Sequence, residues 1–206
     1  MRIVRADDDG TLAAAEVLGG GGVVVVPTDT VYGLAARPAD ADAVRAVFRA
    51  KGRPEGMHLP VLAASLEQVR GLGVDVTPAA LALARRWWPG PLTMAFGFDA
   101  GGGRPSWLIG RDEVAVRIPD HDFLRALLRR TGVLVVTSAN PHGAPTPRTA
   151  PDVAAGLGPS VDLVVDGGRL LDVPSTLVNV CGAEPVVERE GAISRAEVAD
   201  ALADGP

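Results

Sequence analysis

Short apolar runs and amphipathic stretches alternate along the chain, and each run has the length of a strand. The β-branched run at residues 23–26 follows four glycines, which end a short helix predicted over residues 11–18. Residues 113–118 alternate in polarity, so their valines and isoleucine share one face and Arg117 points to the other. Apolar content predicts further strands over residues 59–63, 92–98, 133–137, 163–165, 176–180 and 185–188.

Helical periodicity connects these strands. A helix capped by Asp40 or Asp42 places its apolar residues on one face and ends just before Lys51. Further helices are predicted over residues 65–71 and 77–88, from Asp120 onward, and after Ser194, with Glu197 at its third position. The uneven order of strands and helices favours one α/β domain over residues 1–206, with a mixed, twisted β-sheet flanked by helices, over a regular doubly wound sheet.

Composition narrows the setting in which the protein acts. The chain has 206 residues, enough for one substantial core, and a formal net charge of −5, which argues against non-specific coating of nucleic acid. One cysteine, Cys181, allows no internal disulfide, and no apolar run approaches the length of a membrane span. The first ten residues lack the apolar core of an export signal. We therefore expect a cytoplasmic protein without membrane contact.

Several familiar chemistries are excluded by the motifs. The chain has no GxxxxGK[ST] phosphate loop, and Ser138 does not lie in a GxSxG turn. The three histidines, His58, His121 and His142, do not have the spacing of zinc ligands. A serine hydrolase and a structural zinc site are therefore poor interpretations of this sequence.

Polar residues directly follow several of the apolar runs. In α/β sheets the strand ends form the crevice in which ligands bind, so these residues are candidates for a site. Each segment alone is equally compatible with a turn, because Pro, Thr and Asp all favour turns. The residues concerned are Thr28, Asp29, Thr30 and Tyr32, then Lys51 and Arg53, and finally Ser138 and Asn140.

Lys51 is the only lysine among 20 basic residues. Its ammonium is a compact charge with rotatable donors and suits a phosphate oxygen that moves during a reaction, whereas a guanidinium imposes a fixed fork geometry. The alternative is a solvated residue at a helix end. The surroundings of Lys51 must decide between the two.

Six segments together resemble the YrdC-like family of threonylcarbamoyl-AMP synthases, in order and in approximate spacing. The paired KxR and SxN signatures are specific in combination, and the resemblance covers most of the chain. The segments are PTDTVYGL at residues 27–34, AKGRP at 50–54, VRIP at 116–119, TSANPHG at 137–143, PSTLV at 174–178 and VEREGAI at 187–193.

The resemblance implies a YrdC-like domain and a nucleotidyltransferase activity. Members of the family make L-threonylcarbamoyladenylate and pyrophosphate from L-threonine, bicarbonate or CO2, and ATP, for the threonylcarbamoyladenosine modification of tRNA. Mg²⁺ accompanying ATP, a downstream tRNA threonylcarbamoyl transferase and a tRNA contact are implied in the same way. The chain resembles the short form of the family, which lacks a C-terminal domain.

The family's site residues carry over to named positions. As implied catalytic residues, Lys51, Arg53, Ser138 and Asn140 hold the triphosphate. The implied ATP contacts are these four with Met57, Arg148 and Arg189, and the implied threonine contacts are Thr30, Tyr32, Arg117, Ser138 and Ser175.

Some assignments remain open. Tyr32 is either a wall of the threonine pocket or a buried aromatic that supports a strand end. Asp29 is either a magnesium partner through water or part of an Asx turn, and spacing does not distinguish Thr28 from Thr30 as the threonine contact. Arg148 stands where the family often has a small hydroxyl residue, and residues 57–59 and Leu62 depart from the family pattern.

A second function class is also compatible with the sequence. Some relatives bind double-stranded RNA or tRNA without this catalysis, and a local basic hollow could serve that purpose despite the acidic net charge. The residues that would form it are Arg45, Arg49, Lys51, Arg53 and Arg148.

Overall fold

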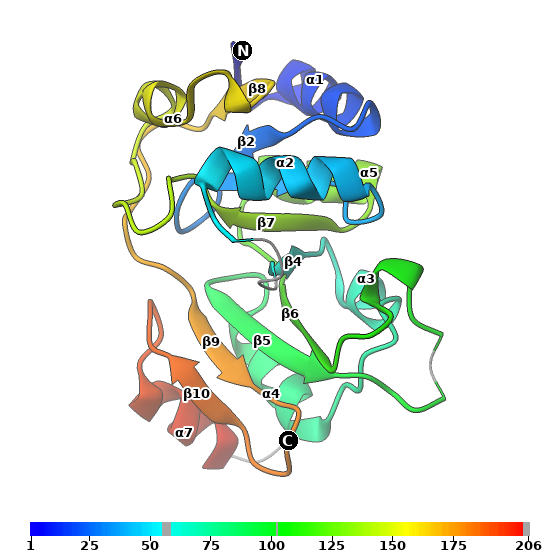
Figure 1. The fold of residues 1–206 in the computed structure, drawn as a ribbon. Coiled ribbons are helices and arrows are strands. Elements are labelled where there is room, and N and C mark those ends of the chain that lie inside the picture. Colours follow the sequence, from blue (N-terminus) through cyan, green and yellow to red (C-terminus); the bar gives the residue numbers. More distant parts are fainter. Residues whose placement is uncertain (55–58, 102, 204–206) are drawn as a thin grey trace.

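One mixed sheet runs through the residues that the computed structural model describes, namely 1–54, 59–101 and 103–203 (Figure 1). Its ten strands follow the order β1-β8-β2-β3-β7-β4-β6-β5-β9-β10. The strands are β1 (Arg2–Arg5), β2 (Val24–Val26), β3 (Gly33–Ala36), β4 (Val61–Leu62), β5 (Leu92–Gly97), β6 (Glu113–Arg117), β7 (Leu134–Ser138), β8 (Leu163–Asp166), β9 (Thr176–Asn179) and β10 (Val186–Arg189). Parallel pairs, such as β5 with β9, and antiparallel pairs, such as β5 with β6, both occur, so the predicted mixed α/β sheet is confirmed.

Helices flank both faces of this sheet. The helices are α1 (Asp8–Gly19), α2 (Ala41–Lys51), α3 (Leu66–Arg70), α4 (Pro78–Trp87), α5 (Asp122–Thr131), α6 (Ala150–Leu157) and α7 (Arg195–Ala203), with 3-10 turns η1 (Ser106–Leu108) and η2 (Gly158–Ser160). In Figure 1, α1, α2, α5 and α6 accompany the strands of one half of the molecule, and α4 and α7 accompany those of the other. Nowhere in the described ranges does a helix combine the length and apolarity needed to cross a membrane.

In the first half, the apolar runs are buried on both faces of the sheet. Along β2, Val24 and Val26 pack with α1 and α5, while Val25 packs in the larger core that includes α2. A strand covered on both sides has no solvated face, which explains why its sequence is uniformly apolar instead of alternating.

In the second half, only one face of the sheet is covered by helices. Val114 and Val116 of β6 are buried in the core that includes α4 and α7, and Met94 of β5 lies in the same core. Arg117 lies on the opposite face, as the alternation of polarity predicts. This uncovered face of β5, β6 and β9 is where a site can form.

The structure corrects several predicted boundaries. The first helix begins at Asp8, three residues before the predicted start, because the Asp7 side chain caps it by accepting from Gly10 N. Lys51 lies in the last turn of α2 and not beyond it.

Two strands and one helix went unpredicted. β1 is a mostly exposed run of four residues, Arg-Ile-Val-Arg, and β3 consists of Gly, Leu and Ala. β1 is defined by its pairing with β8, and β3 by its pairing with β2 and β7. Helix α6 carried a readable signal, because Thr149 caps it by accepting from Asp152 N and a proline occupies its first turn.

Candidate functional site

A cleft of about 660 Å³ lies over the uncovered face of β5, β6 and β9. Its other walls come from the segment after β2, the end of β7 and the segment before β9. Three arginines and several hydroxyl side chains face it. The polar lining residues are Thr28, Thr30, Arg53, Thr93, Glu113, Arg117, Thr137, Ser138, Thr146, Asp172, Ser175 and Arg189.

Gly52 sets the backbone conformation of the segment Lys51–Arg53. Gly52 ends α2 in the left-handed conformation, with φ of 59°, and its N–H donates to Arg49 O at 3.0 Å. Arg53 N donates to Phe48 O at 3.0 Å, so the chain reverses within one residue. A residue with a Cβ would be strained at this φ. The turn leaves Lys51 in the helix and brings Arg53 to the cleft.

Lys51 is buried, with 4% of its surface exposed. Its ammonium donates to the carbonyl oxygens of Ser138 and Asn140, the latter at 2.7 Å, and lies 3.4 Å from Ser138 Oγ. Burial, and then the charge of Arg53, lower the pKa of Lys51 to about 8. Lys51 is therefore not a solvated residue: it joins the end of α2 to the segment after β7.

The segment Ser138–Asn140 is brought together with Lys51, as predicted, although only part of this segment faces the cleft. Ser138 ends β7 opposite Gly33 and lines the cleft. Asn140 is buried behind it, where its Nδ2 donates to the carbonyl oxygens of Pro141 and Ala144. Asn140 thus fixes the loop that follows Ser138.

Arg117 is the centre of a buried polar network. Its Nε donates to Gly90 O at 2.9 Å, one Nη donates to Thr30 Oγ1 at 2.8 Å, and the other pairs with the Asp29 carboxylate. Asp29 is therefore engaged by an arginine in this structure. The Thr28 hydroxyl accepts from Thr30 N at 3.0 Å and closes a local turn. Thr28 and Thr30 both line the cleft, but only Thr30 contacts Arg117.

Ser175 and Arg189 are positioned by a second network. Arg189 Nη2 donates to Ser175 O at 2.9 Å, and the Ser175 hydroxyl lies 2.8 Å from Thr93 Oγ1. Burial, and then the charge of Arg117, lower the pKa of Arg189, so the two guanidinium groups lie near each other. Gly191 permits this arrangement, because a Cβ there would lie 2.3 Å from Pro174 O.

Two predicted residues lie elsewhere, and a third is not described. The Tyr32 side chain is completely buried in the core, with its hydroxyl donating to Gly168 O at 2.6 Å, so it supports a strand end and does not line the cleft. Arg148 is half exposed and approaches the cleft only through Asp172, at 3.4 Å. Met57 falls outside the described residues.

Sequence reasoning missed two polar residues on the floor of the cleft. Thr93 and Glu113 lie on the uncovered face of β5 and β6. Glu113 is four residues before Arg117 on the same strand, so the alternation that predicted the orientation of Arg117 also applies to Glu113. Thr93 could have been found in the same way, between the buried Leu92 and Met94.

No group of three or more His, Cys, Asp or Glu side chains suited to a metal ion occurs in the part of the chain that is described. The described cleft lining contains the carboxylates Glu113 and Asp172, and Asp29 is held by Arg117. This donor set does not form a resident metal centre. It is compatible with Mg²⁺ carried by a nucleotide, which binds mainly through phosphate oxygens and water.

Comparison with known proteins identifies the relatives of this chain. The family model Sua5_yciO_yrdC, described as telomere recombination, matches residues 16–191. The chain is 36% identical over 194 residues to the threonylcarbamoyl-AMP synthase of Bacillus subtilis (strain 168), covering 93% of this chain and 56% of that protein. It is 35% identical over 196 residues to a protein of Mycobacterium tuberculosis (strain H37Rv) named putative threonylcarbamoyl-AMP synthase, covering 94% and 89% of the two chains.

A solved structure has the same fold. The crystal structure of Pyrococcus abyssi Sua5 complexed with L-threonine superposes with a TM-score of 0.88 and 32% sequence identity, covering 100% of this chain and 61% of that one. The present chain thus spans little more than half the length of the B. subtilis protein and of the P. abyssi structure.

Proposed function

The chain belongs to the Sua5/YciO/YrdC family, and we propose that it joins L-threonine, bicarbonate or CO2, and ATP into L-threonylcarbamoyladenylate with release of pyrophosphate. The observation that carries this proposal is the convergence of Arg53, Arg117 and Arg189 in one cleft with several hydroxyl side chains, among them those of Thr30, Ser138 and Ser175. Homologues named for this activity support it.

The reaction needs several fixed cations. The threonine amine and CO2 form a carbamate, whose oxygen attacks the α-phosphorus of ATP while the bond from that phosphorus to the β-phosphate bridging oxygen breaks. An anionic nucleophile thus approaches an anionic electrophile, and pyrophosphate leaves with further negative charge. Guanidinium and ammonium groups that are already in position stabilise this charge without reorganising during the reaction.

The triphosphate end of the cleft is proposed to lie beside Arg53 and Ser138. Lys51 contacts the carbonyl and hydroxyl of Ser138. Its positive charge therefore acts on the triphosphate end of the cleft, although its N–H donors are already engaged. The ordered loop held by Asn140 keeps Ser138 in place. As proposed further ATP contacts, Arg189 faces the cleft directly and Arg148 acts from its edge through Asp172.

The threonine end is proposed to lie beside Thr30, Arg117 and Ser175. Three of the five N–H donors of Arg117 are engaged by Gly90, Thr30 and Asp29, which hold the guanidinium in one orientation. The two remaining donors suit one carboxylate. The solved structure of a relative with L-threonine supports an amino acid as one substrate.

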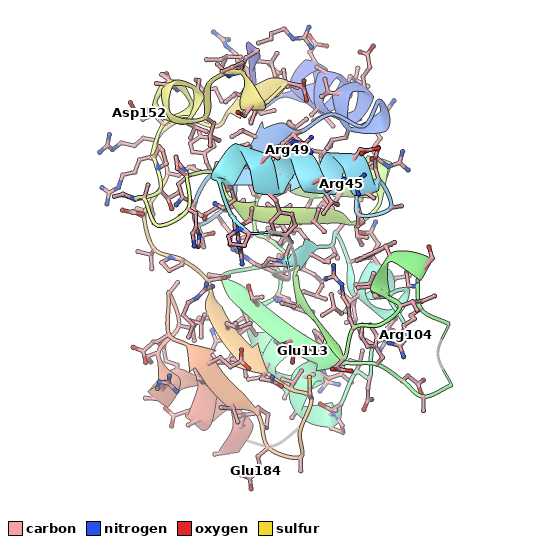
Figure 2. The ribbon with its side chains drawn as sticks, viewed as in Figure 1. Arg45, Arg49, Arg104, Glu113, Asp152 and Glu184 are labelled. Atoms are coloured by element: carbon pink, nitrogen blue, oxygen red, sulfur yellow. The ribbon has the colours of Figure 1, made fainter. Side chains whose placement is uncertain are left out.

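Other partners follow from the chemistry of the product. Mg²⁺ accompanying ATP would offset phosphate charge. An acyl adenylate is labile, so we propose transfer to a downstream tRNA threonylcarbamoyl transferase, with a tRNA contact on the exposed basic residues of α2, Arg45 and Arg49 (Figure 2). A role in tRNA modification would put the protein in the cytoplasm.

Threonine-dependent pyrophosphate release tests the proposed activity. The purified chain, given ATP, Mg²⁺, bicarbonate and L-threonine, should release pyrophosphate and form the adenylate detected by mass spectrometry. Omission of threonine should abolish release. A folded protein that binds RNA but releases no threonine-dependent pyrophosphate would instead support the RNA-binding class.

A matched pair of variants tests the site itself. Arg53→Gln removes a cleft cation, and we expect kcat/KM for pyrophosphate release to fall about 10- to 100-fold, as for a lost charge-assisted hydrogen bond. Arg49→Gln removes an exposed cation four residues earlier and should leave kcat/KM unchanged. Equal effects of the two substitutions would contradict the assignment of the cleft.

A further inference from the structure

Thr93 lies on the floor of the cleft, on the uncovered face of β5. It stands between the buried Leu92 and Met94, and 5% of its own surface is exposed. Valine has the same branched shape and would fill this position without a polar atom. A buried hydroxyl costs free energy unless it is hydrogen-bonded, so the partners of Thr93 decide what its hydroxyl does.

Thr93 and Ser175 form a hydroxyl pair whose protons are not both used. Their Oγ atoms lie 2.8 Å apart, so one hydroxyl donates to the other. Arg189 Nη2 lies 3.3 Å from Ser175 Oγ, and a guanidinium can only donate. The Ser175 oxygen therefore accepts from Arg189, which polarises its O–H bond and favours donation to Thr93. The Thr93 proton then has no acceptor among the described residues.

Thr30 lines the same cleft but has no spare hydroxyl proton. Thr28 donates its own proton to Val31 O at 2.7 Å, so the 3.0 Å contact between the Thr28 and Thr30 hydroxyls is a donation from Thr30. The Thr30 oxygen in turn accepts from Arg117 at 2.8 Å. Toward a ligand, Thr30 can therefore only accept, whereas Thr93 can donate.

The sheet register places Thr93 beside Arg117. β5 and β6 are antiparallel and pair Met94 with Val116, so one step further along the two strands Thr93 lies opposite Arg117. The Cβ atoms of directly opposite residues on one face of a sheet lie about 4.5–5.5 Å apart. Both side chains line the cleft. An anion bound by the free N–H groups of Arg117 is thus within reach of the Thr93 hydroxyl.

We propose that Thr93 is a further threonine-binding residue, whose hydroxyl donates a hydrogen bond to the α-carboxylate held by Arg117. This inference rests on the proposed function, because it takes L-threonine as the substrate. Each oxygen of a carboxylate accepts more than one hydrogen bond, so a hydroxyl can add to the contacts made by a guanidinium. Ser175, ordered by Arg189, keeps the Thr93 proton directed away from itself and toward the ligand.

Two substitutions of Thr93 test this role in the pyrophosphate-release assay. Thr93→Val removes the hydroxyl and keeps the branched shape, and we expect KM for L-threonine to rise at least about tenfold, as for a lost hydrogen bond to a charged group. Because the carboxylate does not react, kcat should stay within about twofold, and so should KM for ATP. Thr93→Ser keeps the hydroxyl and is the matched control, with KM for L-threonine within about threefold of the wild type.

NMR titration with L-threonine and L-threoninamide tests the carboxylate contact without turnover. The amide has no negative charge at this position, so Thr93→Val should weaken L-threonine at least about tenfold and the amide less than about threefold. Unchanged KM and Kd for L-threonine in folded Thr93→Val would overturn the proposal. Equal weakening of the two ligands, or a Thr93→Ser variant as impaired as Thr93→Val, would overturn it as well.

Failure of this inference is distinguishable from failure of the proposed function. A wild-type protein that releases threonine-dependent pyrophosphate, together with a Thr93→Val variant of unchanged KM, contradicts the role of Thr93 alone. A folded wild-type protein that neither binds L-threonine nor releases pyrophosphate with it contradicts both.

Discussion

Replacement of Lys51 by methionine should destabilise the protein, whatever its effect on ATP. The side chain is buried, and its ammonium donates to the carbonyl oxygens of Ser138 and Asn140. Methionine keeps an unbranched apolar stem of similar length and removes the donors. The helix α2 and the segment after β7 would then lose the side-chain hydrogen bonds that join them and keep the backbone bond from His142 N to Lys51 O at 2.7 Å.

The magnitude follows from one abandoned acceptor. A buried acceptor left without a partner costs about 1–3 kcal/mol. The carbonyl of Asn140 would lose the ammonium, whereas the carbonyl of Ser138 would keep the bond that it accepts from Asn140 N at 3.0 Å. We therefore expect the free energy of unfolding to fall by about 1–3 kcal/mol, which for a domain of this size corresponds to a decrease in Tm of about 2–12 °C.

Urea denaturation followed by far-ultraviolet circular dichroism measures this difference. Arg49→Met is the matched control, because Arg49 is an exposed basic residue two positions earlier in α2, and its change should stay within about 0.5 kcal/mol. A Lys51→Met variant as stable as the wild type would refute the argument that the ammonium joins these segments. Lys51 would then be assigned to phosphate chemistry alone.

Three further outcomes are expected. With isotope-labelled lysine, the single side-chain NMR signal of Lys51 should titrate near pH 8, and a midpoint near 10.5 would contradict its burial. Because the folded pKa lies below the ordinary 10.5, the folded state releases this proton before the unfolded state does. The stability of the wild type relative to Lys51→Met should therefore rise as the pH increases from about 8 to 10.5. Tyr32→Phe should cost about 1–2 kcal/mol through the lost bond to Gly168 and leave KM for threonine unchanged, whereas a raised KM with normal stability would return Tyr32 to the threonine pocket. Arg117→Gln should lower the free energy of unfolding by about 3 kcal/mol in urea denaturation, because it leaves the Asp29 carboxylate without its partner. Adding Asp29→Asn should restore at least about 1 kcal/mol, whereas simple additivity of the two effects would show that the pair is not coupled.

The local pattern of apolar and polar residues was sufficient to predict strands that are buried on one face or on both faces. Alternation along residues 113–118 gave both the strand β6 and the opposite orientation of Arg117. The apolar run before Pro27 gave β2. These predictions succeed because side-chain direction alternates along a strand whatever lies beyond it.

Elements without an apolar pattern of their own were not predictable in this way. β1 and β3 are strands because β8, β2 and β7 offer them hydrogen-bond partners. β propensity depends largely on such neighbours, so a strand rich in Gly and Ala, or a run of four mostly exposed residues, carries little signal.

The sequence by itself determined which residues are brought together in the candidate site. Through the family resemblance, Lys51 and Ser138 were both assigned to the triphosphate, and they are in contact. Ser175 was assigned to threonine and Arg189 to ATP, and these two are also in contact. What only the tertiary structure decided is how each side chain is used. Asn140 faces a loop, Tyr32 faces the core and the Lys51 ammonium faces carbonyl oxygens, because burial obliges each polar atom to find a partner and the nearest partners come from segments distant in the sequence.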